Sequence, residues 1–405
     1  MAATMLSLAL VALSLPQQPS PTTFAVRGKV VHTMVGAPID DGVVLIEAGK
    51  ITRVGKASEV VLPAGVLVRS AAVVTPGLID ARATVGLTGV LNVPHDQDHL
   101  DKSDPIQPEL RAIDAYNAKE ELVGWVRSYG ITTVHTGHSA GALVSGQTMV
   151  VKTHGRTVEQ DVVVPFAMLS VGLNDAARGG GKAPGTRAKS VAMLRERLQK
   201  AREREAKRVA GQDVAVDLGL DALGKALAGE VPLLVAAHRS HDILSALRVG
   251  REFGVRIVLD GAAEAYTVLP ELKEAGVWTL PHPPMARTGG DLANGTMALP
   301  KLLAAAELPF ALQSGYEGYV PKTRVVLFEA GVAVGHGLAP DAALRALTVD
   351  AARLLGLDGR LGSLVVGKDA DLAMFDGDPF EYTTHCTGVV IDGIAYEGER
   401  HTGGR

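Results

Sequence analysis

The sequence predicts an α/β fold: a TIM-like (β/α)8 barrel with a small composite β-sandwich domain built from both ends of the chain. The middle of the chain alternates strand patterns with amphipathic helix patterns about every 25 to 30 residues, which favours a parallel barrel. Both ends instead carry short β-type runs separated by Gly, Pro and Asp. With 405 residues, 47% of them hydrophobic, the chain is long enough for a large barrel and a smaller satellite.

The N-terminal segment 1–21 is predicted to be a signal peptide and linker. It contains the apolar run MLSLALVALSL (Met5–Leu15), too short to span a bilayer, which needs about 20 residues, and a stretch rich in Pro, Gln and Ser follows it. We place the cleavage after Ser14, with the small residue Ala12 at position −3. The protein is then exported, to the periplasm or the extracellular space. The alternative is a disordered or buried N-terminal leader.

Residues 22–75 are predicted to form the N-terminal part of the small β domain. They contain the runs FAVRGKVVHTM, GVVLIEAGKITRVG and VLVRSAAVVTPG, with turn residues between them. Matching runs, GSLVVGKDADLAMFDG and GVVIDGIAYEG, lie in 356–405, which we assign to the same domain. The two half-sheets enclose the barrel, predicted over 76–355.

Within the barrel, each strand pattern is paired with a helix pattern. Examples are PLLVAAH before SHDILSALRVGREFG and VRIVLDG before AYTVLPELKEAG. Two segments interrupt this order. A polar insert at 92–114 follows the first barrel strand, where a barrel places its active-face loops. A Gly-, Lys- and Arg-rich stretch at 176–188 precedes a charged helix at 189–210, which we interpret as a solvated surface helix behind a flexible loop rather than an anionic docking surface.

Composition excludes several classes of partner and site. Forty Lys and Arg residues against 44 Asp and Glu give a net charge of −4, so no broad basic field is available for nucleic acid. Cys386 is the single cysteine, which excludes an intramolecular disulfide and every cysteine-rich metal site. No other segment reaches membrane length without charges or glycines, so the protein is not expected to span a membrane. Any metal has to be held by His, Asp, Glu or a modified Lys.

Several motifs resemble one known family. The run VVTPGLIDARAT (Val73–Thr84) resembles the first barrel strand of the amidohydrolase superfamily. The stretches GITTVHTG, AAHRSHDILSALRVGREFGVRIVLDG and GSLVVGKDADLAMFDGDP resemble its imidazolonepropionase-like branch, and the likeness covers nearly all of the mature chain. The resemblance implies a TIM barrel that hydrolyses C–N bonds of cyclic amides or related substrates with zinc or another divalent metal.

This chain departs from the family at the first pair of metal ligands. The family carries a His-x-His pair after the PGLID run, and histidines two apart on a strand face the same side and can bind one Zn²⁺. Here Arg82 and Thr84 stand at those positions. Thr is a poor neutral ligand, and Arg presents only donors and a positive charge where a dication should lie. We therefore expect the metal to be absent or weakly bound.

The later ligand positions are mostly changed as well. His238, at the end of VAAH, matches the family's histidine on strand five and is the residual metal ligand. Gly261 stands where the family has its next histidine, and the second histidine of that pair falls near Tyr266. Gly315 replaces the catalytic aspartate, with Glu317 as a displaced substitute.

Other residues are candidate replacement ligands. Lys152 lies where some relatives carry a carbamylated lysine, although an ordinary strand-end lysine is the simpler interpretation. Seven further histidines are possible replacement ligands, and none forms a helical HxxxH pair with an acidic partner: His95, His99, His135, His138, His154, His241 and His282. The run PHDQDH, with His95 and His99 among aspartates, is the best new cation candidate; its alternative is a hydrated polar loop over the barrel mouth.

Together these changes predict that the family's hydrolysis is lost or greatly reduced, which would make the protein a pseudoenzyme, and no catalytic residue is assigned. One alternative is a hydrolase with unrecognised replacement ligands. Another is a non-catalytic binding or partner subunit, as a homodimer or a heterodimer with an active relative. Metal-independent chemistry with His238 or Glu264 as a base is a third. For ligand binding we expect a set of polar side chains at the mouth, with Arg82 clasping a small anion or carboxylate: Arg82, His238, His241, Glu264 and Tyr266.

Overall fold

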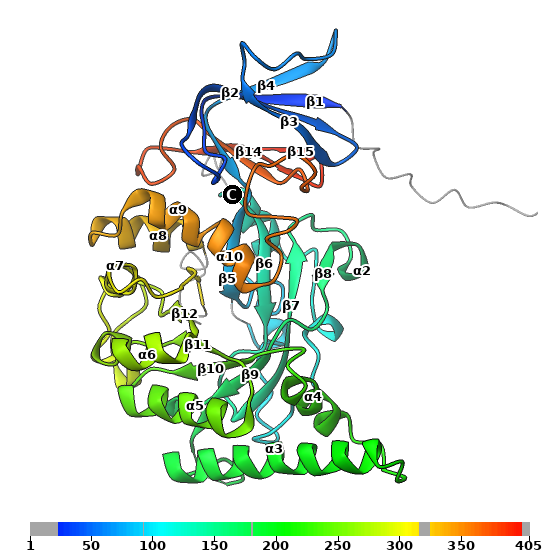
Figure 1. Ribbon diagram of the computed structural model, residues 1–405, viewed down its shortest axis with the longest axis vertical. Helices are drawn as coiled ribbons and strands as arrows, with labels where there is room; N and C mark the ends of the chain where they lie inside the picture. Colours follow the sequence, from blue (N-terminus) through cyan, green and yellow to red (C-terminus); the bar gives the residue numbers. More distant parts are fainter. Residues whose placement is uncertain (1–22, 92, 180, 316–324, 399–405) are drawn as a thin grey trace, which may run out of the picture.

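The computed structural model describes residues 23–91, 93–179, 181–315 and 325–398. The chain folds into two sheets, one above the other along the long axis of the molecule (Figure 1). The predicted signal segment 1–21 and Glu317 lie outside the described residues. No helix within the described ranges has the length and apolar character needed to cross a membrane.

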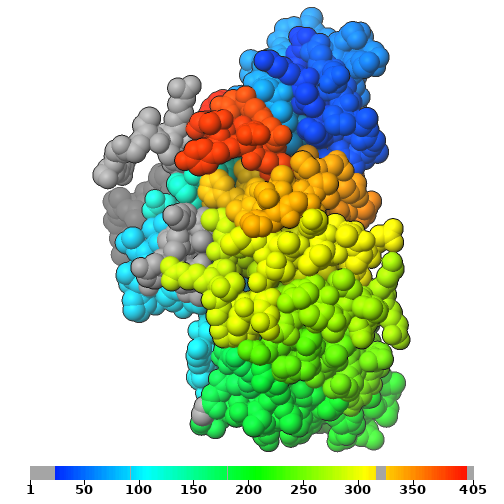
Figure 2. Space-filling view, turned by 90° about the vertical axis from the view of Figure 1, so that its left-hand side faces the viewer, coloured from blue at the N-terminus to red at the C-terminus, as the bar shows by residue number. Residues whose placement is uncertain are grey.

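The smaller sheet takes its strands from both ends of the chain. Its seven strands run in the order β15-β14-β13-β4-β1-β2-β3. Their bounds are β1 Phe24–Val31, β2 Ile39–Glu47, β3 Lys50–Lys56, β4 Leu67–Pro76, β13 Leu372–Phe375, β14 Cys386–Ile391 and β15 Ile394–Glu397. Strand β4 joins the two halves, because it pairs in parallel with β1 and antiparallel with β13. Figure 2 shows the resulting contact, with the C-terminal strands in red against the N-terminal strands in blue at one pole. The sandwich form of this domain stays a prediction.

The larger sheet is a nearly closed barrel. It runs in the order β12-β11-β10-β9-β7-β6-β5, and β8 pairs with β7. Its strands are β5 Leu78–Ala83, β6 Ile131–Gly137, β7 Val144–Lys152, β8 Val162–Val164, β9 Leu169–Gly172, β10 Leu233–Ala237, β11 Ile257–Gly261 and β12 Trp278–Pro281. The segment 310–315 connects the two edges, since Phe310 bridges to Thr279 on β12 and Gly315 bridges to Ala83 on β5.

One barrel strand runs against the predicted direction. Strand β7 pairs antiparallel with both β6 and β9, whereas the sequence pattern predicts a barrel of parallel strands. The cause is the short segment 138–143 between β6 and β7, because a parallel crossover needs about a dozen residues and a hairpin needs only a few. The prediction of an all-parallel barrel is wrong at this strand.

Helices cover the outside of the barrel (Figure 1). They are α1 Glu121–Arg127, α2 Val158–Asp161, α3 Arg187–Val209, α4 Leu218–Leu227, α5 Ser240–Phe253, α6 Leu269–Ala275, α7 Leu299–Ala305, α8 Val326–Gly335, α9 Pro340–Ala346 and α10 Val349–Leu354. In α5 the residues Ile243, Ala246, Leu247 and Phe253 are buried at helical spacing, and Gly254 ends the helix with a left-handed φ of 69°. The charged helix α3 buries one face, which includes Val191, Leu194 and Leu198, and packs against α4 and α5.

The interior of the barrel is apolar below its mouth. Leu234, Val258 and Leu280 form a buried cluster on three neighbouring strands. Each lies two residues before a residue that lines the cavity described below, and therefore points to the same face of its strand. This apolar layer forms the floor beneath the polar residues at the carboxyl ends of the strands.

Candidate functional site

A cavity of about 310 Å³ opens at the carboxyl ends of the barrel strands. Five of the positions at which the resembled family carries its metal ligands and catalytic aspartate line it, whereas Tyr266, near a further histidine position of the family, does not: Arg82, Thr84, His238, Gly261 and Gly315. The alternation of side chains along the strands therefore brings these positions together. Further lining residues include His99, Lys102, Asn174, Asp260, His282, Gln313 and Ser314.

Arg82 is buried at the mouth of the barrel, with 3% of its surface exposed. Its Nη1 donates to the carbonyl oxygens of Ala83 at 2.8 Å and Gly137 at 3.2 Å, and its Nη2 donates to that of His138 at 2.6 Å. Its Nε lies 3.6 Å from the Oδ2 atom of Asp260. Burial lowers the pKa of Arg82 from its ordinary value, and the Asp260 charge opposes that effect. The guanidinium stays charged, so it places a fixed cation among the residues that line the cavity.

Asp260 continues this network across the barrel. Its Oδ1 accepts a hydrogen bond from Gln313 Nε2 at 2.8 Å. The same amide nitrogen lies 3.0 Å from the carbonyl oxygen of Leu280 and 3.2 Å from that of Pro281. Asp260 and Gln313 were not predicted from the sequence, although Asp260 directly precedes the predicted position Gly261 on β11.

A second carboxylate, Asp80, lies two residues before Arg82 on the same strand and is buried. Its Oδ1 accepts the backbone N–H groups of Arg82 and Ser314, each at 3.1 Å, and its Oδ2 accepts the Ser314 hydroxyl at 2.5 Å. Burial raises the pKa of Asp80 to about 7, against the opposing effect of these hydrogen bonds. Asp80 therefore fastens β5 to the segment that closes the barrel and titrates near neutral pH.

His238 occupies the space above Gly261. A Cβ placed on Gly261 would lie 2.2 Å from His238 Cε1, and Gly261 has a φ of +85°, which side chains rarely adopt. The Nδ1 atom of His238 is buried and has no hydrogen-bond partner among the described residues. Burial lowers the pKa of His238, although Asp260 and other acids oppose this, so the imidazole is neutral at pH 7. His282 has a lowered pKa for the same main reason, and its Nε2 is also buried and unpaired in the described structure.

The donor set does not fit a divalent metal ion. Within the described ranges, no group of three or more His, Cys, Asp or Glu side chains is arranged to hold one. Thr84 Oγ1 lies 3.3 Å from Thr88 Oγ1, and Gly315 contributes no side chain to the cavity. A dication at this position would face the Arg82 guanidinium, which repels it.

Three of the residues expected at the mouth lie elsewhere. His241, Glu264 and Tyr266 are not among the residues that line the cavity. His241 is exposed on α5, and its Nε2 lies 3.6 Å from a carboxylate oxygen of Asp242. The Glu264 carboxylate accepts hydrogen bonds from the Ser240 backbone N–H at 2.8 Å and from Asn294 Nδ2 at 2.7 Å, while the Tyr266 hydroxyl donates to the Asn294 carbonyl at 3.1 Å. The first contact holds the loop after β11 against the start of α5, and the other two hold it against Asn294.

The cation candidate in the polar insert is also separated by the fold. His99 is buried and lines the cavity, whereas His95 is exposed and faces Asp96, with its Nε2 3.6 Å from that carboxylate. The two histidines therefore do not share one metal site with the nearby aspartates in the described part of the chain.

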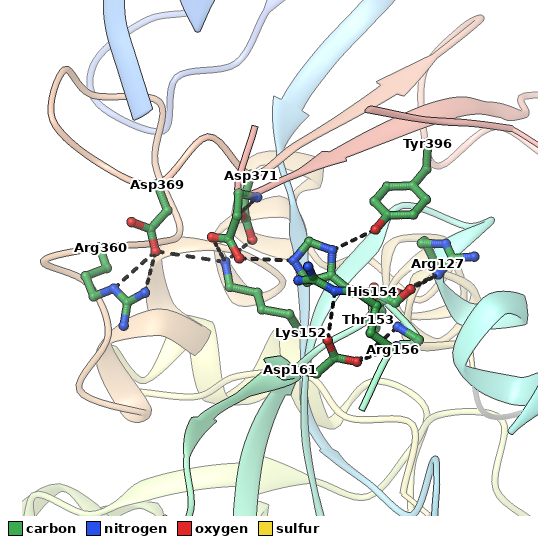
Figure 3. Close-up of polar contacts among 12 residues, drawn as sticks. Arg127, Lys152, Thr153, His154, Arg156, Asp161, Arg360, Asp369, Asp371 and Tyr396 are labelled. Carbon is green, nitrogen blue, oxygen red and sulfur yellow. Dashed lines mark hydrogen bonds and ion pairs between the residues drawn. The ribbon is translucent and has the colours of Figure 1, made fainter. Parts of the chain in front are cut away.

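Lys152 lies at the opposite end of the barrel from the cavity. It pairs with Thr133 near the start of β6, because β7 runs antiparallel. Its Nζ lies 2.5 Å from Asp371 Oδ2 and 3.3 Å from Asp392 Oδ1, in a buried cluster between the barrel and the smaller sheet (Figure 3). Lys152 therefore cannot contribute a bridging carbamate at the mouth.

The fold is similar to those of two solved structures. The crystal structure of an amidohydrolase from Thermotoga maritima MSB8 matches with a TM-score of 0.84 and 26% identity, over 92% of this chain and 100% of that one. The structure of an adenosine deaminase from Xanthomonas campestris with bound zinc has a TM-score of 0.56 at 17% identity over 93% of each chain, a likeness in fold alone.

At the level of sequence, amidohydrolase tasK from Hapsidospora irregularis is 25% identical over 395 residues, which is 87% of this chain and 40% of that protein. The chain thus spans about two fifths of the length of this relative. The sequence model of the amidohydrolase family matches residues 173–395, which is more than half of the chain. The chain therefore belongs to the amidohydrolase family.

Proposed function

We propose that this member of the amidohydrolase family does not carry out metal-dependent hydrolysis and that its barrel binds a small, uncharged, polar molecule. The observation that carries this proposal is the Arg82 guanidinium, fixed by carbonyl oxygens and by Asp260 at the position where the family's metal ligands begin. The proposal includes descent of the barrel from the imidazolonepropionase-like branch, which the sequence motifs resemble.

The chemistry of the cavity supports the loss of hydrolysis. A catalytic metal activates water by lowering its pKa to about 7 and needs several protein ligands to hold it. His238 is the conventional ligand that remains, and Gly315 removes the carboxylate that would accept the proton of the attacking water. Second-layer hydrogen bonds cannot replace ligands that the chain does not have.

The cavity also indicates the character of the ligand. The expected capture of an anion by Arg82 is not favoured, because its Nη1 and Nη2 atoms already donate to three carbonyl oxygens. His238 Nδ1, His282 Nε2 and Asn174 Oδ1 are buried polar atoms without a partner in the described structure, and each gains by hydrogen bonding to a ligand. Neutral imidazoles and an amide suit an amide- or urea-like molecule better than a carboxylate.

Two further expectations from the sequence belong to this proposal. Export through the N-terminal segment would place the protein in the periplasm or outside the cell. Pairing with a second copy or with an active relative would use the intact scaffold. Purification from the native host tests both, and recovery of the protein alone from the cytoplasm would contradict them.

Metal analysis and ligand screening test the main proposal. Protein purified without chelator is expected to contain well under one equivalent of zinc. Small amides and ureas are expected to raise the melting temperature more than matched carboxylates, and a ligand at one hundred times its Kd stabilises by about 2.7 kcal/mol. His238→Ala should abolish this shift, while His241→Ala, at an exposed position outside the cavity, should keep it.

Two results would overturn the proposal. The first is a full equivalent of zinc retained through dialysis together with lactam hydrolysis that stops on chelation. The second is a ligand response that His238→Ala and His241→Ala leave equally intact, because binding would then not take place in the cavity.

A further inference from the structure

Arg82 lies within a set of oxygen atoms that come from different parts of the barrel mouth. The carbonyl of Ala83 belongs to β5, the carbonyls of Gly137 and His138 end β6, and the carboxylate of Asp260 belongs to β11. Strands β5 and β11 are not neighbours in the sheet. The guanidinium therefore connects separate strands across the mouth as well as adjacent ones.

These oxygens form a site with the properties of a cation site. Three carbonyl oxygens and, at 3.6 Å, one carboxylate oxygen lie around a single buried guanidinium. This arrangement costs free energy unless a positive charge occupies it. The planar guanidinium meets several acceptors at once, as a compact ammonium cannot. Because the side chain is covalently attached, this cation cannot dissociate.

We infer that Arg82 is the built-in cation of the barrel mouth and that removing its side chain opens a binding site selective for a free guanidinium ion. Arg82 then connects the strand ends with one another, as a bound metal does in a barrel that has a complete set of ligands. This inference concerns stability, and it holds whether or not the cavity binds the ligand proposed above.

The experiment is chemical rescue of the Arg82→Ala protein. The variant is expected to melt at a lower temperature than the parent protein. Millimolar guanidinium, far below denaturing concentrations, should raise its melting temperature in a saturable way. Urea serves as the matched control compound, because it is planar and of similar size but uncharged, and it should have no such effect.

Control variants separate the site from general effects of the salt. Arg353→Ala removes a surface arginine whose side chain is 49% exposed and pairs with Asp350, so guanidinium should not stabilise this variant. Arg82→Met keeps most of the packing volume without the charge, and it should be destabilised yet leave too little room for rescue. Arg82→Lys should lie between the parent protein and Arg82→Met in melting temperature.

If Arg82→Ala does not fold alone, its refolding yield from urea is measured with and without guanidinium, and a yield that rises with guanidinium supports the inference. Three results would overturn it: an Arg82→Met protein as stable as the parent, rescue by urea equal to that by guanidinium, or no effect of guanidinium on either melting or refolding of Arg82→Ala.

Discussion

Replacing Lys152 with Met tests how the barrel is fastened to the smaller sheet. The side chains of Lys152 and Asp371 are 3% and 5% exposed, and Nζ lies 2.5 Å from Oδ2 (Figure 3). Met keeps the aliphatic packing but leaves the carboxylates of Asp371 and Asp392 without their shared cation. Breaking a buried pair from one side costs about 3–5 kcal/mol, because it leaves an uncompensated buried charge. We expect the free energy of unfolding to fall by that amount at pH 7.

The assay is urea unfolding monitored by circular dichroism and fluorescence. Lys50→Met is the matched control, because Lys50 also contacts a buried carboxylate, that of Asp369 at 2.5 Å, but is itself 50% exposed. Asp369 keeps its contact with Arg360, so this control should lose about 1 kcal/mol or less. Equal losses for the two variants, or a Lys152→Met protein as stable as the parent, would refute the argument.

The pH dependence of the loss gives a second check. Burial raises the pKa of Asp371 and Lys152 counteracts it, so without the lysine the carboxyl binds a proton more readily in the folded state. A raised folded-state pKa of an acid means that stability falls as pH rises. The free energy of unfolding that Lys152→Met loses relative to the parent protein should therefore be smaller at pH 5 than at pH 8. Adding Asp371→Asn should recover most of that loss.

Three further predictions concern the barrel. Asp80 has a folded-state pKa of about 7 against an ordinary value of 3.8, so the parent protein should lose on the order of 4 kcal/mol of unfolding free energy as pH rises between these values. Asp80→Asn should remove this pH dependence in unfolding experiments from pH 4 to 8, and an unchanged dependence would contradict the prediction. Leu233→Asp, at a fully buried position of β10, should give no folded protein by circular dichroism, because an unpaired buried carboxylate costs several kcal/mol. A cooperative thermal unfolding transition near that of the parent protein would show that the strand is misplaced. The quadruple variant with Arg82→His, Thr84→His, Gly261→His and Gly315→Asp carries the family residues, and it should fail to bind zinc in calorimetry. The reason is that both glycines have a positive φ and that a Cβ at Gly261 meets His238. Tight zinc binding would show that the backbone adapts.

The sequence was sufficient to place most of the family's ligand positions at one mouth, although not those at Lys152 and near Tyr266. Residues two apart on a strand share a face, so a correct register brings Arg82, Thr84 and His238 to the same cavity. The partners of Arg82 could not be predicted in this way. They are mainly backbone carbonyls, among them those of Gly137 and His138. Every residue has a backbone carbonyl, so the residue type does not indicate which of them accepts a hydrogen bond.

Other features were missed for different reasons. The reversed direction of β7 could have been inferred from the short segment 138–143, which leaves no room for a crossover helix. Glu264 and Tyr266 were expected among the polar side chains of the mouth, but the turn after β11 directs both toward Asn294 instead. Polar type and position along the chain do not determine which side of a loop a side chain occupies.

The order of strands in the smaller sheet affects how the protein can be synthesised. Pro76 on β4 pairs with Leu372 on β13, so one edge of β4 has no partner until almost the entire polypeptide has left the ribosome. During that interval the N-terminal strands present an open edge, which is a template for aggregation. Chains that stop before β13 should therefore accumulate in inclusion bodies even when the barrel segment is complete, and a chaperone that shields β-edges should matter more to this protein than to one whose sheets are formed from consecutive strands.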